Sequence, residues 1–467
     1  MSTILIAGGT VVTAAGTLDA DVLTDGEKIA AVLPRRPEGT TSVTADRVID
    51  ATGRYVLPGG IDAHVHMELP FGGTVSSDTF ETGSRAAAWG GTTTIIDFAV
   101  QAKGTSLLAG LDRWHAKADG NCVIDYGFHM IVSDVNDQSC KEIDVLVGEG
   151  VTSFKLFMAY PGVFYSTDGE ILLAMQQART SGATVMMHAE NGIAIDVLVH
   201  QALSRGETAP RYHGATRPDE TETEATGRAI VLAKVAGGPP LYIVHLSTTG
   251  ALEAVAEARN QGHNVFAETC PQYLFLSSDD MAREGFEGAK YVCSTPLRAK
   301  EHQANLWRGL RTDDLSVVST DHCPFCFKEQ KELGLGDFSK IPNGIPGVEN
   351  RVDLIYQGVL SGEISLSRWV EVNSTTPARM FGLYPKKGVL APGSDADIVL
   401  YDPAAEQTLS AATHHMNVDY SAYEGKAITG RVVTVLSRGR VIIEDGRYLG
   451  EKGWGRYLPR GANEYLV

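Results

Sequence analysis

The chain has 467 residues, of which 43% are hydrophobic and 21% are charged, so it can form a large core and is ordinary in composition. Its formal net charge of −17 disfavours binding to nucleic acid or to an anionic membrane surface. The sequence contains no apolar stretch of about eighteen residues, and its N-terminal residues are typical of a strand rather than of a signal peptide.

The six cysteines are scattered through the chain, which is typical of reduced thiols rather than of a disulfide framework. Cys323 and Cys326 have CxxC spacing, but no second CxxC pair is present to complete a structural zinc site. We therefore predict a cytoplasmic protein in which this pair has neither a redox nor a structural-zinc role.

Both ends of the chain carry short strand patterns. Alternating or apolar runs with turn signals between them occur at 3–13, 28–33 and 45–50, and again at 395–402, 430–440 and 441–449. We expect these runs to pair into one small β-sandwich domain made from residues 1–54 and 381–467.

The middle of the chain alternates apolar runs with helical patterns. The runs are 59–66, 91–100, 123–133, 151–160, 183–191, 240–247, 263–270 and 315–323. The helical patterns are 78–89, 106–118, 171–180, 222–236, 251–260 and 301–310. Eight buried strands that alternate with helices predict an α/β fold, a (β/α)8 TIM-like barrel over residues 55–380. The long link before the eighth run is expected to form part of an active-site loop.

Polar residues stand at or near the carboxyl ends of five of these runs. They are His64, His66, Lys155, His188, His245 and Asp321. In a barrel these ends meet on one face, which is where active sites of this fold lie. Polar groups that end apolar strands are costly to bury unless they bind metal or take part in chemistry.

The pair His64-Val-His66 places two imidazoles on the same side of a strand, where they can hold one metal ion. His188 and His245 end two further runs and are predicted to bind a second ion. Asp321 ends the eighth run, where a carboxylate can both bind metal and accept a proton from water.

Lys155 is unusual at such a site, because two divalent cations would repel an ammonium group. Carboxylation of Lys155 by CO2 gives a carbamate with one negative charge and two oxygens. Such a group can bridge two ions at the separation of about 3.5–4 Å that is typical of two-metal sites. We therefore predict a carboxylated lysine at this position.

Several long segments resemble the dihydropyrimidinases and D-hydantoinases of the amidohydrolase superfamily. They are GGIDAHVHMELPFGGTVSSDTFETGSRAAAWGGTTTIIDF, FKLFMAY, MMHAENG, HLSTTGAL, ETCPQYL, STDHCPFCFKEQK, IPNGIPGVENR and HHMNVDYSAYEG. The resemblance covers essentially the whole chain. It implies that a metal-bridging hydroxide opens the cyclic amide of dihydrouracil, dihydrothymine or a hydantoin, and that the product is an N-carbamoyl amino acid.

The resemblance also implies roles for individual residues. His64, His66, Lys155 and Asp321 would hold one divalent ion, and Lys155, His188 and His245 would hold the other, with zinc favoured. Asp321 would act as general base and acid, and Tyr160 would donate to the developing oxyanion. Ser294 and Asn343 would bind the ring amide, largely through backbone groups. Leu69, Phe71, Phe157 and Phe164 would line the pocket for the ring substituent.

Other interpretations of the sequence remain open. Dihydroorotases have an arginine where this chain has Glu68, and allantoinases usually have asparagine and then glutamate where it has Glu68 and Leu69. Collapsin-response-mediator-like proteins share the fold without catalysis, but they lack the full metal-binding set. His129 and His322 are expected to be structural. The resemblance further implies a homotetramer or dimer that acts on a small molecule.

Overall fold

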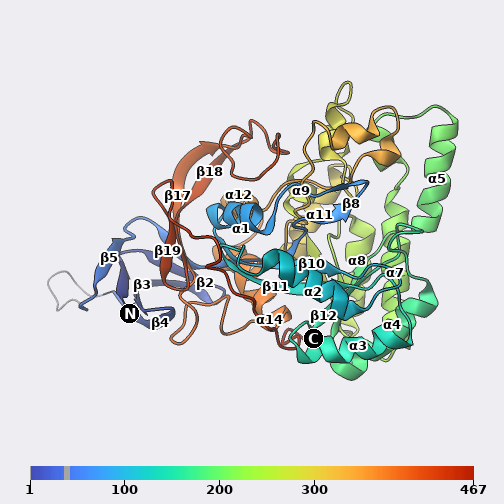
Figure 1. The fold of residues 1–467 in the computed structure, drawn as a ribbon. Coiled ribbons are helices and arrows are strands. Elements are labelled where there is room, and N and C mark those ends of the chain that lie inside the picture. Colours follow the sequence, from blue (N-terminus) through green and yellow to red (C-terminus); the bar gives the residue numbers. More distant parts are fainter. Residues whose placement is uncertain (1, 36–42, 467) are drawn as a thin grey trace.

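The computed structural model describes residues 2–35 and 43–466. Its central part is a barrel of parallel strands that follow one another in chain order, with helices packed around it (Figure 1). The strands are β7 (Gly60–Val65), β10 (Thr92–Val100), β11 (Asp125–Ile131), β12 (Ser153–Phe157), β13 (Thr184–His188), β14 (Leu241–Ile243), β15 (Val265–Thr269) and β16 (Val317–Val318). Each lies within one of the eight apolar runs, so the predicted barrel is confirmed.

The first and last strands of the barrel come together around His322. Val65 forms a parallel bridge with His322, and the backbone N–H of His66 donates to the carbonyl of His322 at 2.8 Å. The hydroxyl of Thr320 donates to the Asp62 carboxylate at 2.6 Å. These contacts close the ring of strands where β16 is only two residues long.

Several helices around the barrel begin at residues that cap them. Ser106 caps α2 through its side chain, and Thr167 forms a capping box with Glu170 at the start of α4. The larger helices are α1 (Phe80–Trp89), α2 (Leu107–Ala118), α3 (Asp137–Gly148), α4 (Asp168–Ser181), α5 (Gly192–Ser204), α7 (Asp219–Val235), α8 (Thr249–Asn260), α11 (Glu301–Thr312) and α12 (Arg351–Leu360). The six predicted helical segments correspond to α1, α2, α4, α7, α8 and α11, whereas α3, α5 and α12 were not predicted.

Short elements fill the connections. They are β8 (Pro70–Phe71), β9 (Thr74–Val75), α6 (Arg211–Ala215), α9 (Pro271–Phe275), α10 (Ser278–Met281), η1 (Glu287–Tyr291), η2 (Lys331–Gly334), η3 (Phe338–Lys340), α13 (Leu366–Val370), η4 (Glu371–Thr375) and α14 (Thr376–Met380). The helices η1, α9 and α10 lie in the long link before the eighth barrel strand.

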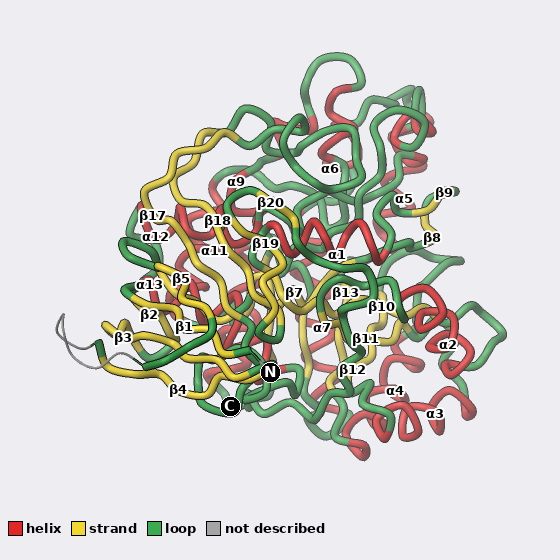
Figure 2. The backbone as a smooth tube through the Cα atoms, turned by 60° about the vertical axis from the view of Figure 1, so that its left-hand side comes forward, coloured by secondary structure: helices red, strands yellow, loops and turns green. Residues whose placement is uncertain are grey.

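Strands from both ends of the chain form a second, ten-stranded sheet beside the barrel (Figure 2). They are β1 (Thr3–Ala7), β2 (Thr10–Thr13), β3 (Gly16–Asp25), β4 (Lys28–Pro34), β5 (Arg47–Asp50), β6 (Tyr55–Pro58), β17 (Ile398–Thr408), β18 (Ala427–Ser437), β19 (Arg440–Glu444) and β20 (Arg447–Tyr448). β6 joins the two ends, because it pairs with β2 on one side and β17 on the other. Ile6, Val22 and Leu400 pack in one apolar core of this sheet.

We propose that the chain divides into an end domain of residues 1–54 and 381–467 and a barrel domain of residues 55–380. β6 falls on the barrel side of this boundary although it pairs within the end sheet, and it leads directly into β7. Among residues 2–35 and 43–466, no helix has the length and apolar character needed to cross a membrane.

Candidate metal centre and active site

The carboxyl ends of the barrel strands bring the six predicted polar residues together. His64 lies on β7 and His66 follows it, Lys155 lies on β12, His188 ends β13, His245 follows β14, and Asp321 follows β16. All six are buried. The expectation that these strand ends meet on one face is therefore met by the structure.

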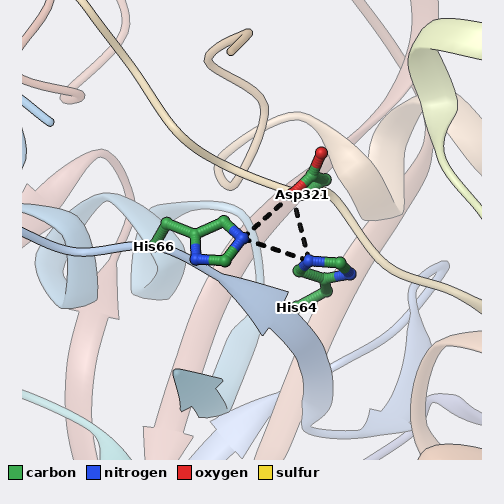
Figure 3. Close-up of side chains that lie close together, drawn as sticks. All are labelled: His64, His66 and Asp321. Atoms are coloured by element: carbon green, nitrogen blue, oxygen red, sulfur yellow. Dashed lines mark hydrogen bonds and ion pairs between the residues drawn. The ribbon is translucent and has the colours of Figure 1, made fainter. Parts of the chain in front are cut away.

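His64, His66 and Asp321 form a compact cluster (Figure 3). The two Nε2 atoms are 3.2 Å apart, and Asp321 Oδ1 lies 3.1 Å from Nε2 of His64 and 3.2 Å from Nε2 of His66. The ammonium nitrogen of Lys155 lies 3.0 Å from the same His64 Nε2. Three possible ligand atoms and the nitrogen of Lys155 thus converge in one place.

This spacing fits a metal ion. Metal–ligand bonds of about 2.0–2.2 Å place neighbouring ligand atoms a little over 3 Å apart, whereas two imidazole nitrogens gain little from facing one another directly. The Nδ1 atom of His66 is buried and has no hydrogen-bond partner in the part of the chain that the structure describes. The donor set of imidazole nitrogens and carboxylate oxygen suits a borderline divalent ion such as zinc.

A second pair of imidazoles lies beside this cluster. Nδ1 of His188 is 2.9 Å from Nε2 of His245, and the rings of His64 and His245 have centroids 5.6 Å apart. The other ring nitrogen of His245 is buried without a partner among the described residues. These two histidines therefore offer a second set of nitrogen donors next to the first.

Two buried glutamates orient the histidines from behind. Glu268 contacts Nδ1 of His64, and Glu190 Oε2 lies 2.8 Å from Nε2 of His188. Each carboxylate accepts a hydrogen bond from a ring N–H and leaves the opposite nitrogen free to face the cluster, which is how outer carboxylates act at metal sites. Glu268 and Glu190 were not singled out from the sequence, although each ends or follows a barrel strand near a predicted ligand.

Lys155 is almost completely buried, with 2% of its surface exposed. Burial lowers the pKa of its amine to about 8, and its nitrogen lies 4.4 Å from the centroid of the Phe98 ring. A substantial fraction of neutral amine at physiological pH is what attack on CO2 requires. The surroundings of Lys155 therefore suit carbamate formation.

Asp321 is held as a carboxylate. Burial alone would raise its pKa, but the adjacent imidazoles of His64 and His66 hold it well below the usual value. Asp321, His245 and Tyr160 also have left-handed backbone conformations, with φ of 51°, 40° and 61°. Non-glycine residues seldom adopt this region, and such strain collects at functional sites.

One pocket opens over the cluster, and twelve of the thirteen predicted site residues line it. They are His66, Leu69, Phe71, Lys155, Phe157, Tyr160, Phe164, His188, His245, Ser294, Asp321 and Asn343. Ile131, Cys323 and Gly344 also line it but were not predicted as site residues. The remaining predicted residue, His64, is fully buried and in contact with the cluster.

The polar wall of this pocket contains Tyr160, Ser294 and Asn343. The side-chain amide of Asn343 donates to Tyr160 Oη at 3.3 Å and to Ser294 Oγ at 3.2 Å. Burial, with a contribution from Glu190, raises the pKa of Tyr160. The phenol therefore remains protonated at neutral pH and can donate a hydrogen bond.

The apolar wall consists of Leu69, Phe71, Phe157 and Phe164. The rings of Phe157 and Phe164 stack with centroids 5.0 Å apart, and Phe71 stacks on Phe164 at 6.2 Å. Phe157 also stacks on His188 at 5.2 Å, so the apolar wall reaches the histidine cluster. A ring substituent placed here would contact aromatic faces.

The residues expected to be structural make contacts outside the cluster. His129 has Nε2 3.0 Å from the carbonyl of Ala63, and His322 has Nε2 3.0 Å from Asp78 Oδ2. Cys323 and Cys326 are both free thiols.

Comparison with known proteins places this site in a family. The model of the amidohydrolase family matches residues 55–442. A D-hydantoinase of Streptomyces coelicolor is 66% identical over 99% of both chains. The crystal structure of a dihydropyrimidinase from Brevibacillus agri is similar with a TM-score of 0.96, at 50% identity over 98% of this chain and 99% of that one. An L-hydantoinase (dihydropyrimidinase) from Arthrobacter aurescens has a TM-score of 0.88 at 32% identity, over 98% of this chain and 100% of that one. The chain therefore belongs to the amidohydrolase family, and within it to the cyclic amidohydrolases that include the D-hydantoinases and dihydropyrimidinases.

Proposed function

We propose that this enzyme opens the ring amide of D-5-substituted hydantoins and of 5,6-dihydropyrimidines such as dihydrouracil and dihydrothymine, giving N-carbamoyl amino acids. The observation that carries the proposal is the convergence of the four histidines, Lys155 and Asp321 below a pocket with one polar and one aromatic wall. The 66% identity to a D-hydantoinase, against 32% to an L-hydantoinase, supports the D preference.

The metal-binding roles follow from the clusters described above. His64, His66, Lys155 and Asp321 would hold one divalent ion, and Lys155, His188 and His245 would hold the other, with a carbamate on Lys155 shared between them and zinc as the favoured metal. When bound, such ions lower the pKa of water to near neutrality and polarise the carbonyl group of a substrate.

Asp321 and Tyr160 would move protons and stabilise charge during ring opening. Asp321 accepts the proton of the attacking water and delivers it to the ring nitrogen as the C–N bond breaks and the new C–O bond forms. Tyr160 donates its phenolic hydrogen bond to the carbonyl oxygen as negative charge develops there, which in enzymes is usually a large contribution to rate.

Ser294 and Asn343 would hold the ring through their backbone groups. A cyclic amide or imide presents alternating N–H and C=O groups at its edge, and a backbone carbonyl and N–H are complementary to that pattern. Leu69, Phe71, Phe157 and Phe164 would contact the ring substituent. A single methylene in such a pocket changes specificity by about 1–3 kcal/mol.

Ring opening of hydantoin and dihydrouracil by the metal-loaded enzyme tests this proposal. The loss of ultraviolet absorbance from the cyclic amide is followed with and without a chelator, in the wild type and in Lys155→Ala. We expect wild-type activity that the chelator abolishes and that Lys155→Ala lacks. If protein with two bound ions opens neither ring, the substrate assignment is wrong, and allantoin and dihydroorotate become the substrates to test.

We further propose that the enzyme acts in the cytoplasm as a homotetramer or dimer, as in the family it resembles. Light scattering coupled to size-exclusion chromatography distinguishes these assemblies from a monomer of 50.0 kDa.

A further inference from the structure

Lys331 is a fully buried lysine that lies behind the polar wall of the pocket. It begins η2 and has none of its surface exposed. Lysine is seldom buried completely unless a carboxylate pairs with it. Among the described residues no carboxylate lies within ion-pair distance of Lys331, so a different set of partners must stabilise its charge.

Three backbone carbonyls from two loops are these partners. The ammonium of Lys331 donates to the oxygens of Val292 at 2.9 Å, Pro342 at 2.6 Å and Gly344 at 2.9 Å. An ammonium group has three N–H donors, and here each has one acceptor. Burial lowers the pKa of Lys331 to about 7, and the three carbonyl dipoles favour its charged form.

These carbonyls flank the two residues that face the pocket. Pro342 and Gly344 lie on either side of Asn343, and Val292 lies two residues before Ser294. The Val292 oxygen also accepts from the N–H of Gly344 at 3.0 Å, which joins the two loops directly. The position of Gly344 leaves no room for a side chain, since a Cβ atom there would lie 2.1 Å from the carbonyl oxygen of Cys323.

Other buried side chains hold two further carbonyls of the first loop. Nε2 of His213 lies 2.8 Å from the oxygen of Cys293, and Tyr273 donates its hydroxyl to the oxygen of Thr295 at 2.9 Å. Within residues 2–35 and 43–466, by contrast, the backbone N–H and C=O groups of Ser294 and Asn343 form no hydrogen bond. The contacts that fix these loops thus leave free the backbone groups of two residues that line the pocket.

We infer that Lys331 is a positioning residue for substrate recognition. Its three hydrogen bonds set the separation of the two loops, and at that separation the free backbone groups of Ser294 and Asn343 bind opposite parts of the ring amide. This inference rests on the proposed function, because it takes the ring amide to be what these groups bind. Lys331 itself touches neither the substrate pocket nor the histidine cluster.

Lys331→Met tests this role, because it preserves the length of the side chain and removes all three donors. The carbonyls of Val292, Pro342 and Gly344 would then be buried without a partner and would move apart. We expect the KM for hydantoin and for dihydrouracil to rise at least about tenfold, equivalent to about 1.4 kcal/mol. We expect kcat to change by less than about threefold, and the bound metal to remain at the wild-type content. Lys328→Met is the matched control, since Lys328 is exposed in the same segment and should retain the wild-type KM.

The split between KM and kcat separates positioning from a purely structural role. A structural role would reduce the active fraction and the melting temperature and leave KM unchanged, and that result would overturn the inference. If Lys331→Met does not fold, Lys331→Gln, which retains two donors, should show a smaller rise in KM, and an unchanged KM would again contradict us. If the metal-loaded wild type opens neither ring, the proposed function and this inference both fail. If the wild type is active and the variant has an unaltered KM, the inference alone fails.

Discussion

Glu268 lies behind His64 and joins it to neighbouring strands. Besides contacting His64 Nδ1, it accepts the N–H of His245 at 3.1 Å and the hydroxyl of Tyr242 at 2.8 Å. We predict that Glu268→Gln lowers metal affinity by about 10–100-fold, because the imidazole of His64 loses the carboxylate that fixes its tautomer and orientation. Competition with a chromophoric chelator measures this. Glu253→Gln, at an exposed position on α8, is the control, and equal affinities in the two variants would contradict the prediction.

Tyr160 carries a second prediction. Tyr160→Phe removes only the phenolic hydroxyl. The loss of one oxyanion donor lowers kcat by about 10²–10³-fold. We expect a fall of that size with unchanged metal content. Tyr165→Phe, in the same loop, should retain wild-type kcat. A loss of less than about fivefold in Tyr160→Phe would show that another group stabilises the oxyanion.

The convergence of the six polar side chains could be predicted because strand ends of a barrel meet, so position in the sequence indicates position in space. Glu268, Glu190 and Lys331 could not be predicted in this way. Their roles depend on which atoms lie behind the pocket, and a charged residue in or after an apolar run does not show whether its partner is an imidazole, a carbonyl or water.

The hairpin of β8 and β9 forms part of the aromatic wall. Phe71 lies on β8, and its ring contacts Tyr160 edge-on at 5.3 Å as well as stacking on Phe164. We predict that Phe71→Ala lowers kcat/KM for 5-phenylhydantoin relative to unsubstituted hydantoin by about 2–10-fold, the loss of one aromatic contact. Comparison of the two substrates measures this. Val75→Ala, on the exposed side of the same hairpin, should leave the ratio unchanged, and an unchanged ratio in Phe71→Ala would place the substituent elsewhere.

The number and order of the barrel strands were predictable because each strand, covered on both faces, lies in a largely apolar run. Strand length was less predictable. The eighth run became only the two residues of β16, since the segment after it turns to bring Asp321 into the site. Helices α3 and α5 were missed, and α5 is mostly apolar yet largely exposed at the edge of the molecule (Figure 1).

At the scale of the whole molecule, Lys387 links the barrel to the end sheet. Its ammonium contacts Asp125 at 2.6 Å, Asp395 at 3.0 Å and Asp397 at 2.5 Å, and all four residues are buried. Asp125 begins β11, whereas Asp395 and Asp397 precede β17. We predict that Lys387→Met destabilises the protein by about 3–5 kcal/mol, because it leaves the buried Asp397 without an ion-pair partner among the described residues. Asp125 retains Arg438 and Asp395 retains Lys28. Urea unfolding measures this, with exposed Lys386→Met as the control.

The destabilisation caused by Lys387→Met depends on pH, because the pKa values of Asp395 and Lys387 are shifted in the folded protein. Burial raises the pKa of Asp395, but the ammonium of Lys387 lowers it and holds it below its usual range. The stabilisation of the folded state by Asp395 is therefore present above pH about 4 and is lost as the pH falls further. The carboxylates raise the pKa of Lys387, so its contribution is present below pH about 10 and is lost as pH rises through the raised value. In Lys387→Met the buried and unpaired Asp397 would resist ionisation, so the deficit should be larger at pH 8 than at pH 5. An equal deficit at both values would contradict this.

The pairing of β6 with β17 has a consequence for biosynthesis. β6 ends at residue 58 and its partner begins at residue 398, so most of the polypeptide must be made before this edge is covered. Until then β6 presents open backbone groups on the nascent chain, which is a site for misassembly and a natural place for chaperones to act. β7 follows β6 directly, and its His64 and His66 lie against Asp321, so this cluster cannot assemble before the chain has been made at least as far as residue 321. Metal supplied before that point would therefore meet an incomplete set of the proposed ligands.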